Sequence, residues 1–257
     1  MLEVDPRPDS TYDLTWITRV CGCPGAPGHS PSGTIGHVPS LTIAPARADQ
    51  LDAIGELTVA VYRGEGFSPQ EYEPQLRAAA SRAASATVLV AEVDGAVAGA
   101  VTVATRGGEW AEQAVPGEAV IRMLVVDPAA RGTGTGEALV RACLEAARAD
   151  GCTVVRLSSQ PEMTTAHRIY ERVGFVRTPS FDWYPIPGLL LLAYALPLAP
   201  WCGHCGEELT PEGHTACRRM AELDPPRYCP DCRRRMVVQV TPTGWSARCV
   251  EHGTRTG

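Results

Sequence analysis

The chain of 257 residues contains no lysine, and all 23 of its basic side chains are arginine. The Walker A phosphate-binding loop is therefore excluded, because it requires a Gly-Lys-Ser/Thr sequence. A lysine Schiff base and an internal lysine acceptor of acyl groups are excluded for the same reason.

Long hydrophobic segments are also missing. The apolar run Leu189–Leu198 is too short for a membrane-spanning helix, which needs about 20 residues, and we expect a buried strand there. The N-terminus lacks the basic region and apolar stretch of a secretory signal. We expect a cytoplasmic protein that binds no membrane. In that compartment, clustered cysteines indicate metal or redox chemistry more often than disulfides.

An excess of positive charge is absent too. The formal net charge is −6, which argues against a nucleic-acid partner. Residues 41–197 carry 13 basic and 18 acidic side chains, whereas residues 198–257 carry 8 and 7. The acidic first part is compatible with a cationic amine as ligand.

Composition and periodicity divide the chain into three parts. Residues 1–40 are rich in Pro, Gly and Ser and predict a flexible extension. Residues 41–197 predict the order β-α-α-β-β-β-α-β-α-β-β, which is a mixed α/β domain. Its first two helices are expected at 49–62 and 68–84, with Asp49 and Ser68 as N-caps. Residues 198–257 form a separate Cys/His-rich part.

The sequence IRMLVVDPAARGTGTGEALV, at residues 121–140, predicts a strand, a glycine-rich loop and a helix. Glycines let the backbone approach a ligand closely. The N–H groups and the dipole at a helix N-terminus favour phosphate or pyrophosphate, and Arg131 adds a positive charge. Gly132, Gly134 and Gly136 do not have the G-x-G-x-x-G spacing of a dinucleotide-binding fold.

The motif Arg131-x-x-Gly134-x-Gly136, with AHRIYERVGF after it, resembles the GNAT family of acetyl-CoA-dependent N-acetyltransferases. The resemblance covers residues 41–197. It implies an α/β GNAT fold, in which helices flank a mixed, mostly antiparallel sheet. It also implies that backbone groups of Leu124, Val125 and Val126 bind pantetheine. The residues expected to bind the pyrophosphate are Arg131, Gly132, Thr133, Gly134, Thr135 and Gly136.

Two catalytic residues follow from this resemblance. Tyr170 is expected near the thioester sulfur, where its phenol would protonate the departing thiolate. The alternative is an aromatic side chain that only packs on the cofactor. Many relatives carry a glutamate on the strand before the glycine loop, and Glu118 is the nearest candidate for this general base. The alternatives are a solvated strand end and a water chain acting as base.

The last part of the chain contains two sets of metal-binding spacing, C-x2-C-x8-H-x2-C and C-x2-C-x16-C-x2-H. Three thiolates and one imidazole form a common tetrahedral zinc set. The second set closes both ends of a predicted hairpin, as in a zinc ribbon. A segment this short has little core and needs such a staple. The expected ligands are Cys202, Cys205, His214 and Cys217, followed by Cys229, Cys232, Cys249 and His252.

Residues 201–253, which include PPRYCPDCRRRMVVQVTPTGWSARCVEHG, resemble the biotin synthase auxiliary proteins of actinobacteria. This resemblance implies an association with an iron–sulfur cluster and with biotin synthase. Soft thiolates bind zinc and iron–sulfur clusters alike, so both metals stay open.

The sequence thus predicts an N-acetyltransferase that transfers an acetyl group from acetyl-CoA to an amine of a small molecule or peptide and carries a metal module. The alternative is an accessory iron–sulfur protein that supports biotin synthase, with the acetyltransferase attached by gene fusion.

Overall fold

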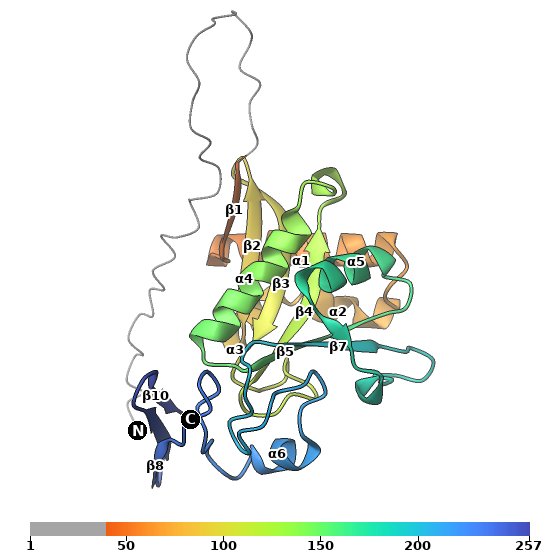
Figure 1. Cartoon of the computed structure of the whole chain (residues 1–257). Helices are drawn as coiled ribbons and strands as arrows, with labels where there is room; N and C mark the ends of the chain where they lie inside the picture. Colours follow the sequence, from red (N-terminus) through yellow and green to blue (C-terminus); the bar gives the residue numbers. More distant parts are fainter. Residues whose placement is uncertain (1–39) are drawn as a thin grey trace, which may run out of the picture.

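The computed structural model describes residues 40–257 (Figure 1). The extension predicted for residues 1–40 lies, except for Ser40, outside the described residues. A seven-stranded sheet has the order β1-β2-β3-β4-β5-β7-β6. Only β4 and β5 are parallel in this sheet, so it is mixed and mostly antiparallel, as expected. The strands are β1 Leu41–Pro45, β2 Thr87–Val93, β3 Ala96–Ala104, β4 Glu118–Val126, β5 Val154–Ser159, β6 Val176–Arg177 and β7 Leu192–Pro197.

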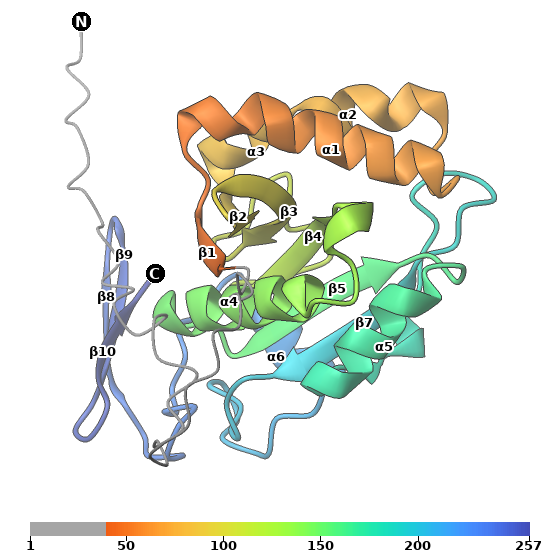
Figure 2. The same ribbon diagram turned by 90° about the horizontal axis from the view of Figure 1, so that it is seen from above.

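Helices cover both faces of this sheet (Figure 2). One face carries α1, α2 and α3, and the other carries α4 and α5. Strand residues alternate between the two cores: Leu89 packs under α4, whereas Val88 and Val90 pack under α1 and α3. The helices are α1 Leu51–Gly64, α2 Glu73–Arg77, α3 Ala79–Ser85, α4 Thr135–Ala149 and α5 Thr164–Val173.

Three local predictions were wrong. The helix expected at 68–84 is split into a 3-10 turn, α2 and α3. Pro74, in the first turn of α2, removes an N–H and its ring clashes with the preceding turn, and Ala78, with a ψ of 53°, separates α2 from α3. Asp49 does not cap α1, since this helix follows the 3-10 turn Ala48–Gln50 and its N-cap is Gln50. The second-last strand of the predicted order is reduced to the two residues of β6, because Pro179 opens another 3-10 turn soon after it.

The Cys/His-rich part lies beside this domain (Figure 1). It contains α6 Thr215–Met220 and a three-stranded sheet of β8 Val237–Thr241, β9 Gly244–Cys249 and β10 Gly253–Thr256. The hairpin β8–β9 was expected and β10 was not. Within the described chain, no helix is both long and apolar enough to cross a membrane.

Candidate active site and metal centres

The glycine loop joins a short 3-10 turn at Pro128–Ala130 to the N-terminus of α4. Gly132 and Gly134 have positive φ angles of 77° and 87°, and a Cβ atom at either position would meet no atom within 4 Å. Their backbone therefore faces open space. Gly136 is different, because a Cβ there would lie 3.0 Å from Ile169 Cδ1. The loop is thus open on one side and tightly packed on the other.

The first turn of α4 has N–H groups without acceptors inside the helix, as every α-helix does. The Thr133 hydroxyl donates to Ala130 O at 2.7 Å and lies 2.8 Å from Thr135 Oγ1, which fixes the loop. Arg131 Nη1 donates to Glu65 Oε1 at 2.6 Å and ties the loop to the end of α1. The chemistry of this end of α4 fits a phosphate or pyrophosphate group.

Strands β4 and β5 separate in the middle of the sheet. Their described ladder runs from Glu118↔Val154 to Ile121↔Leu157. Beyond that point β4 continues along β3, while β5 continues along β7. A bulge in β4 gives Met123 a φ of 51° at the point of separation. The edge of β4 at 122–126, which includes Leu124, Val125 and Val126, is therefore turned toward the gap that an extended ligand arm would need.

A cavity of about 420 Å³ lies at this separation. Val120–Met123 of β4 and Ser158 and Ser159 of β5 line its floor, together with Gln160. Arg122 of β4 is one of its charged side chains. The other aromatic and acidic side chains of its lining come from α1, from the segment between α1 and α2, and from the loops after β3 and β6: Tyr62, Phe67, Tyr72, Glu109, Trp110, Glu112 and Trp183. Arg122 binds Glu112 at 2.9 Å and lies over the Trp110 ring at 5.6 Å.

Tyr170 lies on α5 and is 6% exposed. Its ring centroid lies 6.0 Å from that of Phe175 and 5.9 Å from that of Tyr194. Burial raises the pKa of its phenol, so the proton is held at neutral pH. A protonated phenol can donate but cannot act as a base. The role of Tyr170 as proton donor stays a prediction.

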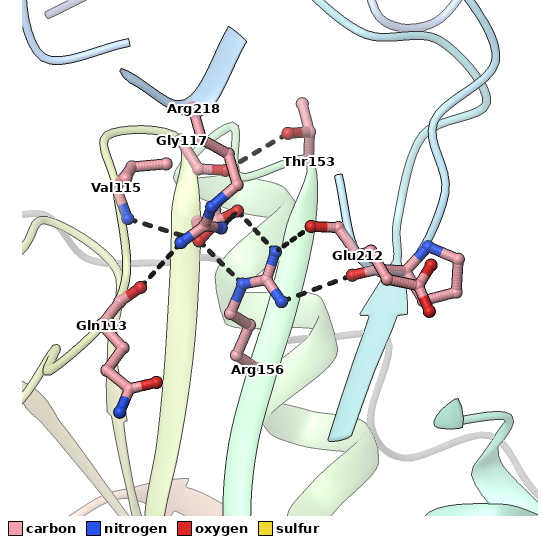
Figure 3. Close-up of polar contacts among 9 residues, drawn as sticks. Gln113, Val115, Gly117, Thr153, Arg156, Glu212 and Arg218 are labelled. Carbon is pink, nitrogen blue, oxygen red and sulfur yellow. Dashed lines mark hydrogen bonds and ion pairs between the residues drawn. The ribbon is translucent and has the colours of Figure 1, made fainter. Parts of the chain in front are cut away.

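Glu118 begins β4 and is 5% exposed, but it does not line the cavity. Its two carboxylate oxygens accept hydrogen bonds from Arg156, one from Nε at 2.8 Å and one from Nη2 at 2.9 Å. Arg218 Nη1 donates to the same carboxylate (Figure 3). Because both oxygens are bound by guanidinium groups, the geometry favours an ion-pair role for Glu118 over the predicted role of general base.

The structure brings each predicted ligand set together. In the first set, Cys202, Cys205, His214 and Cys217 have ligand atoms within 4.8 Å of one another. Cys205 Sγ lies 3.1 Å from His214 Nδ1. The set joins the first Cys-x-x-Cys loop to α6, because His214 is the N-cap of this helix and Cys217 lies inside it.

The second set consists of Cys229, Cys232, Cys249 and His252, also within 4.8 Å. Cys232 Sγ lies 3.7 Å from Cys249 Sγ, and Cys229 Sγ lies 3.6 Å from His252 Nδ1. With zinc–sulfur bonds of about 2.3 Å, two thiolates of a tetrahedron lie about 3.8 Å apart. The donors of this set therefore fit one ion that all four share. An iron–sulfur cluster distributes its thiolates over several iron atoms.

Some residues at these sites were not anticipated from the sequence. Arg156 and Arg218 are the partners of Glu118, and Arg122 lines the cavity. Arg156 had a recognisable signal, because a charge inside the apolar strand 153–159 needs a buried partner. No residue near Arg156 in the sequence indicated which side chain this partner is.

Two family models match the chain. Residues 51–175 match the model described as the acetyltransferase (GNAT) family, and residues 236–257 match the model of the biotin synthase auxiliary protein family.

Curated relatives match the same two parts. A biotin synthase auxiliary protein of Mycobacterium tuberculosis (strain ATCC 25618 / H37Rv) is 51% identical over 53 residues, which are 21% of this chain and 61% of that protein. A mycothiol acetyltransferase of Cellulomonas flavigena is 38% identical over 112 residues, which are 43% of this chain and 32% of that protein. The chain thus spans less than two thirds of either relative.

Solved structures share the fold of the first part. A GNAT-family acetyltransferase from Staphylococcus aureus Mu50 aligns with a TM-score of 0.50 and 14% identity, covering 62% of this chain and 99% of that one. A putative GNAT-family acetyltransferase from Desulfovibrio desulfuricans aligns with a TM-score of 0.51 and 18% identity, covering 62% and 100%. These similarities confirm the expected fold.

Proposed function

We propose that the protein transfers the acetyl group of acetyl-CoA to a primary amine, because residues 51–175 match the acetyltransferase (GNAT) family model. The observation that carries the proposal is the arrangement of the glycine loop and the separated strands. The open backbone of Gly132 and Gly134 stands at the N-terminus of α4. The unpaired edge of β4 leads from there to the cavity.

In this proposal, backbone groups of Leu124, Val125 and Val126 bind the pantetheine arm. The N–H groups of residues 131–136 bind the pyrophosphate. Acetyl-CoA supplies the thioester carbonyl that the amine attacks. Tyr170 gives its phenolic proton to the thiolate that leaves, and burial raises the pKa of the phenol, so the group is protonated before the reaction at neutral pH.

The amine binds in the cavity, whose aromatic walls suit the apolar part of an acceptor. Glu109 lines the same cavity and favours a cationic amine, whereas Glu112 is already paired with Arg122. Because Glu118 is held by two arginines, we assign removal of the amine proton to water in the cavity rather than to this carboxylate.

Calorimetry with acetyl-CoA and a turnover assay over a panel of amines test this function. We expect saturable binding of one acetyl-CoA per chain and release of free CoA thiol with at least one amine. Absence of binding would refute the proposal. Binding without turnover on any amine would instead indicate a domain that senses acetyl-CoA.

The Cys/His-rich part at residues 198–257, called the tail from here on, supports a second candidate function. Its similarity to a biotin synthase auxiliary protein, together with two complete ligand sets, favours an accessory role for biotin synthase. We propose one zinc ion in each set, because the close spacing of the donors fits a single ion.

The accessory role is tested by complementation. A host that lacks its own auxiliary protein receives either the full chain or the Cys249→Ser variant of it. Restored biotin synthesis that depends on Cys249 would support it, and no restoration by the full chain would contradict it.

A further inference from the structure

The first metal set lies directly on the acetyltransferase domain. Arg218, which follows the ligand Cys217 on α6, reaches the carboxylate of Glu118 at the start of β4 (Figure 3). The side chains of Glu118, Arg156 and Arg218 are 5%, 8% and 15% exposed. A charged side chain that is buried to this degree needs a partner of opposite charge, because little water reaches it. The tail therefore supplies a second guanidinium group to a buried carboxylate of the other domain, beside Arg156 of that domain.

Further bonds fix the same junction. Arg156 Nη1 and Nη2 donate to the backbone oxygens of Pro211 and Glu212 at 3.3 and 3.4 Å. Arg218 Nη2 donates to Gln113 O at 2.8 Å, in the loop before β4. The two guanidinium groups also lie 4.4 and 4.9 Å from the ring centroid of Phe181. Each domain thus binds backbone of the other, and both arginines share one aromatic ring.

The helix that presents Arg218 depends on the metal ligands. Helix α6 has six residues, which is far too short to be stable on its own. Its N-cap His214 and its internal residue Cys217 both belong to the first ligand set. A shared ion would connect them to Cys202 and Cys205, so ordering of α6 and metal binding are coupled.

From these contacts we propose that a metal ion in the first set holds α6 on the acetyltransferase domain, so that metal binding there stabilises the start of β4 through Arg218 and Glu118. The second set does not have this effect. Its strand β10 contacts the acetyltransferase domain through Arg255, which donates to Gly151 O at 2.9 Å in the turn before β5 and not to the carboxylate of Glu118.

The proposal concerns a strand that serves the whole active site. Strand β4 begins at Glu118, lines the cavity at 120–123 and presents its unpaired edge at 122–126. The inference rests on metal binding and not on acetyl transfer. A failure to find an amine substrate would leave it intact.

Hydrogen exchange of the full chain, prepared with Zn²⁺ and after chelation, tests the proposal, with zinc content measured on each sample. We expect the amides of 118–121 and 154–157 to exchange roughly tenfold faster or more after chelation. Cys217→Ser should reproduce this increase in the presence of Zn²⁺. Cys249→Ser, the matched change in the second set, should leave these amides protected.

A second pair of variants separates Arg218 from the folding of the metal site. Arg218→Met keeps all four ligands of the first set and should speed exchange at 118–121 with zinc still bound. Arg219→Met, the same change one residue further on α6, should not. The proposal is overturned if chelation and Arg218→Met both leave 118–121 protected. It is also overturned if Cys249→Ser exposes β4 as much as Cys217→Ser does.

Discussion

At the scale of single residues, Tyr170 carries the most specific chemical prediction. Tyr170→Phe removes the phenolic proton and keeps the ring packing against Phe175. We expect kcat to fall about 100-fold, with the KM for acetyl-CoA little changed. Steady-state kinetics measure this, with Tyr194→Phe, another buried tyrosine, as the control. An unchanged kcat in Tyr170→Phe would show that the ring only packs.

The same residue predicts a pH dependence. Burial raises the pKa of Tyr170 above its ordinary value of about 10. Because a raised pKa keeps the phenol protonated to higher pH, loss of its proton should not lower kcat anywhere below about pH 10. A pH profile of kcat measures this. A falling limb between pH 7 and 9 that is absent in Tyr170→Phe would contradict it.

Substitution of Glu118 distinguishes a role of this side chain in an ion pair from a role as general base. Glu118→Gln leaves Arg156 and Arg218 without their shared charge partner, so we expect a loss of about 3–5 kcal/mol in the free energy of unfolding. Glu112→Gln breaks a more exposed pair with Arg122 and should cost about 1 kcal/mol or less. Denaturant unfolding measures both. A stable but inactive Glu118→Gln variant would restore the role of general base.

At the scale of elements, the glycine loop and its helix form one functional unit. Gly134 caps α4 in the left-handed region and has open space above it. Gly134→Ala adds backbone strain of about 1 kcal/mol and a methyl group where the pyrophosphate would approach, so we expect at least roughly tenfold weaker binding of acetyl-CoA. Calorimetry measures the Kd.

The β2–β3 turn offers a matched control for this change. Gly95 has a φ of 83° and is equally open, but it lies in that turn, away from the loop. Gly95→Ala should therefore cost similar stability and leave the Kd unchanged. Equal Kd values for Gly134→Ala and the unmodified protein would remove the loop from the binding site.

At the scale of the whole molecule, a sheet with its own large core is joined to a tail that has little core. The hydrophobic core of the ribbon, residues 229–256, consists of Cys229, Met236, Ala247 and Cys249, and two of these are ligands. Such a small core does not fold without a staple. We expect about two zinc ions per chain, about one in Cys249→Ser, and loss of ribbon structure on chelation. Metal analysis and circular dichroism measure this. Matched iron and sulfide in anaerobically purified protein would contradict the zinc assignment.

The sequence by itself determined the features that depend on neighbouring residues. The element order, the glycine loop at the start of α4 and the Cys-x-x-Cys spacing are written in short segments, because caps, turns and ligand pairs involve residues close together in the chain. The two resemblances, each carried by such segments, agree with the family models at 51–175 and 236–257. The single helix expected at 68–84 was wrong even locally, since Pro74 cannot continue the preceding turn and the backbone of Ala78 leaves the helical region.

Only the tertiary structure decided which side chains share a partner. Glu118 meets Arg156 from 38 residues away and Arg218 from 100 residues away. The cavity likewise joins α1, β4 and the loops after β3 and β6, and the separation of β4 from β5 opens it. Such meetings depend on how the layers pack and how the tail folds back on the sheet. A buried charge in the sequence signals that a partner exists, but only packing selects that partner.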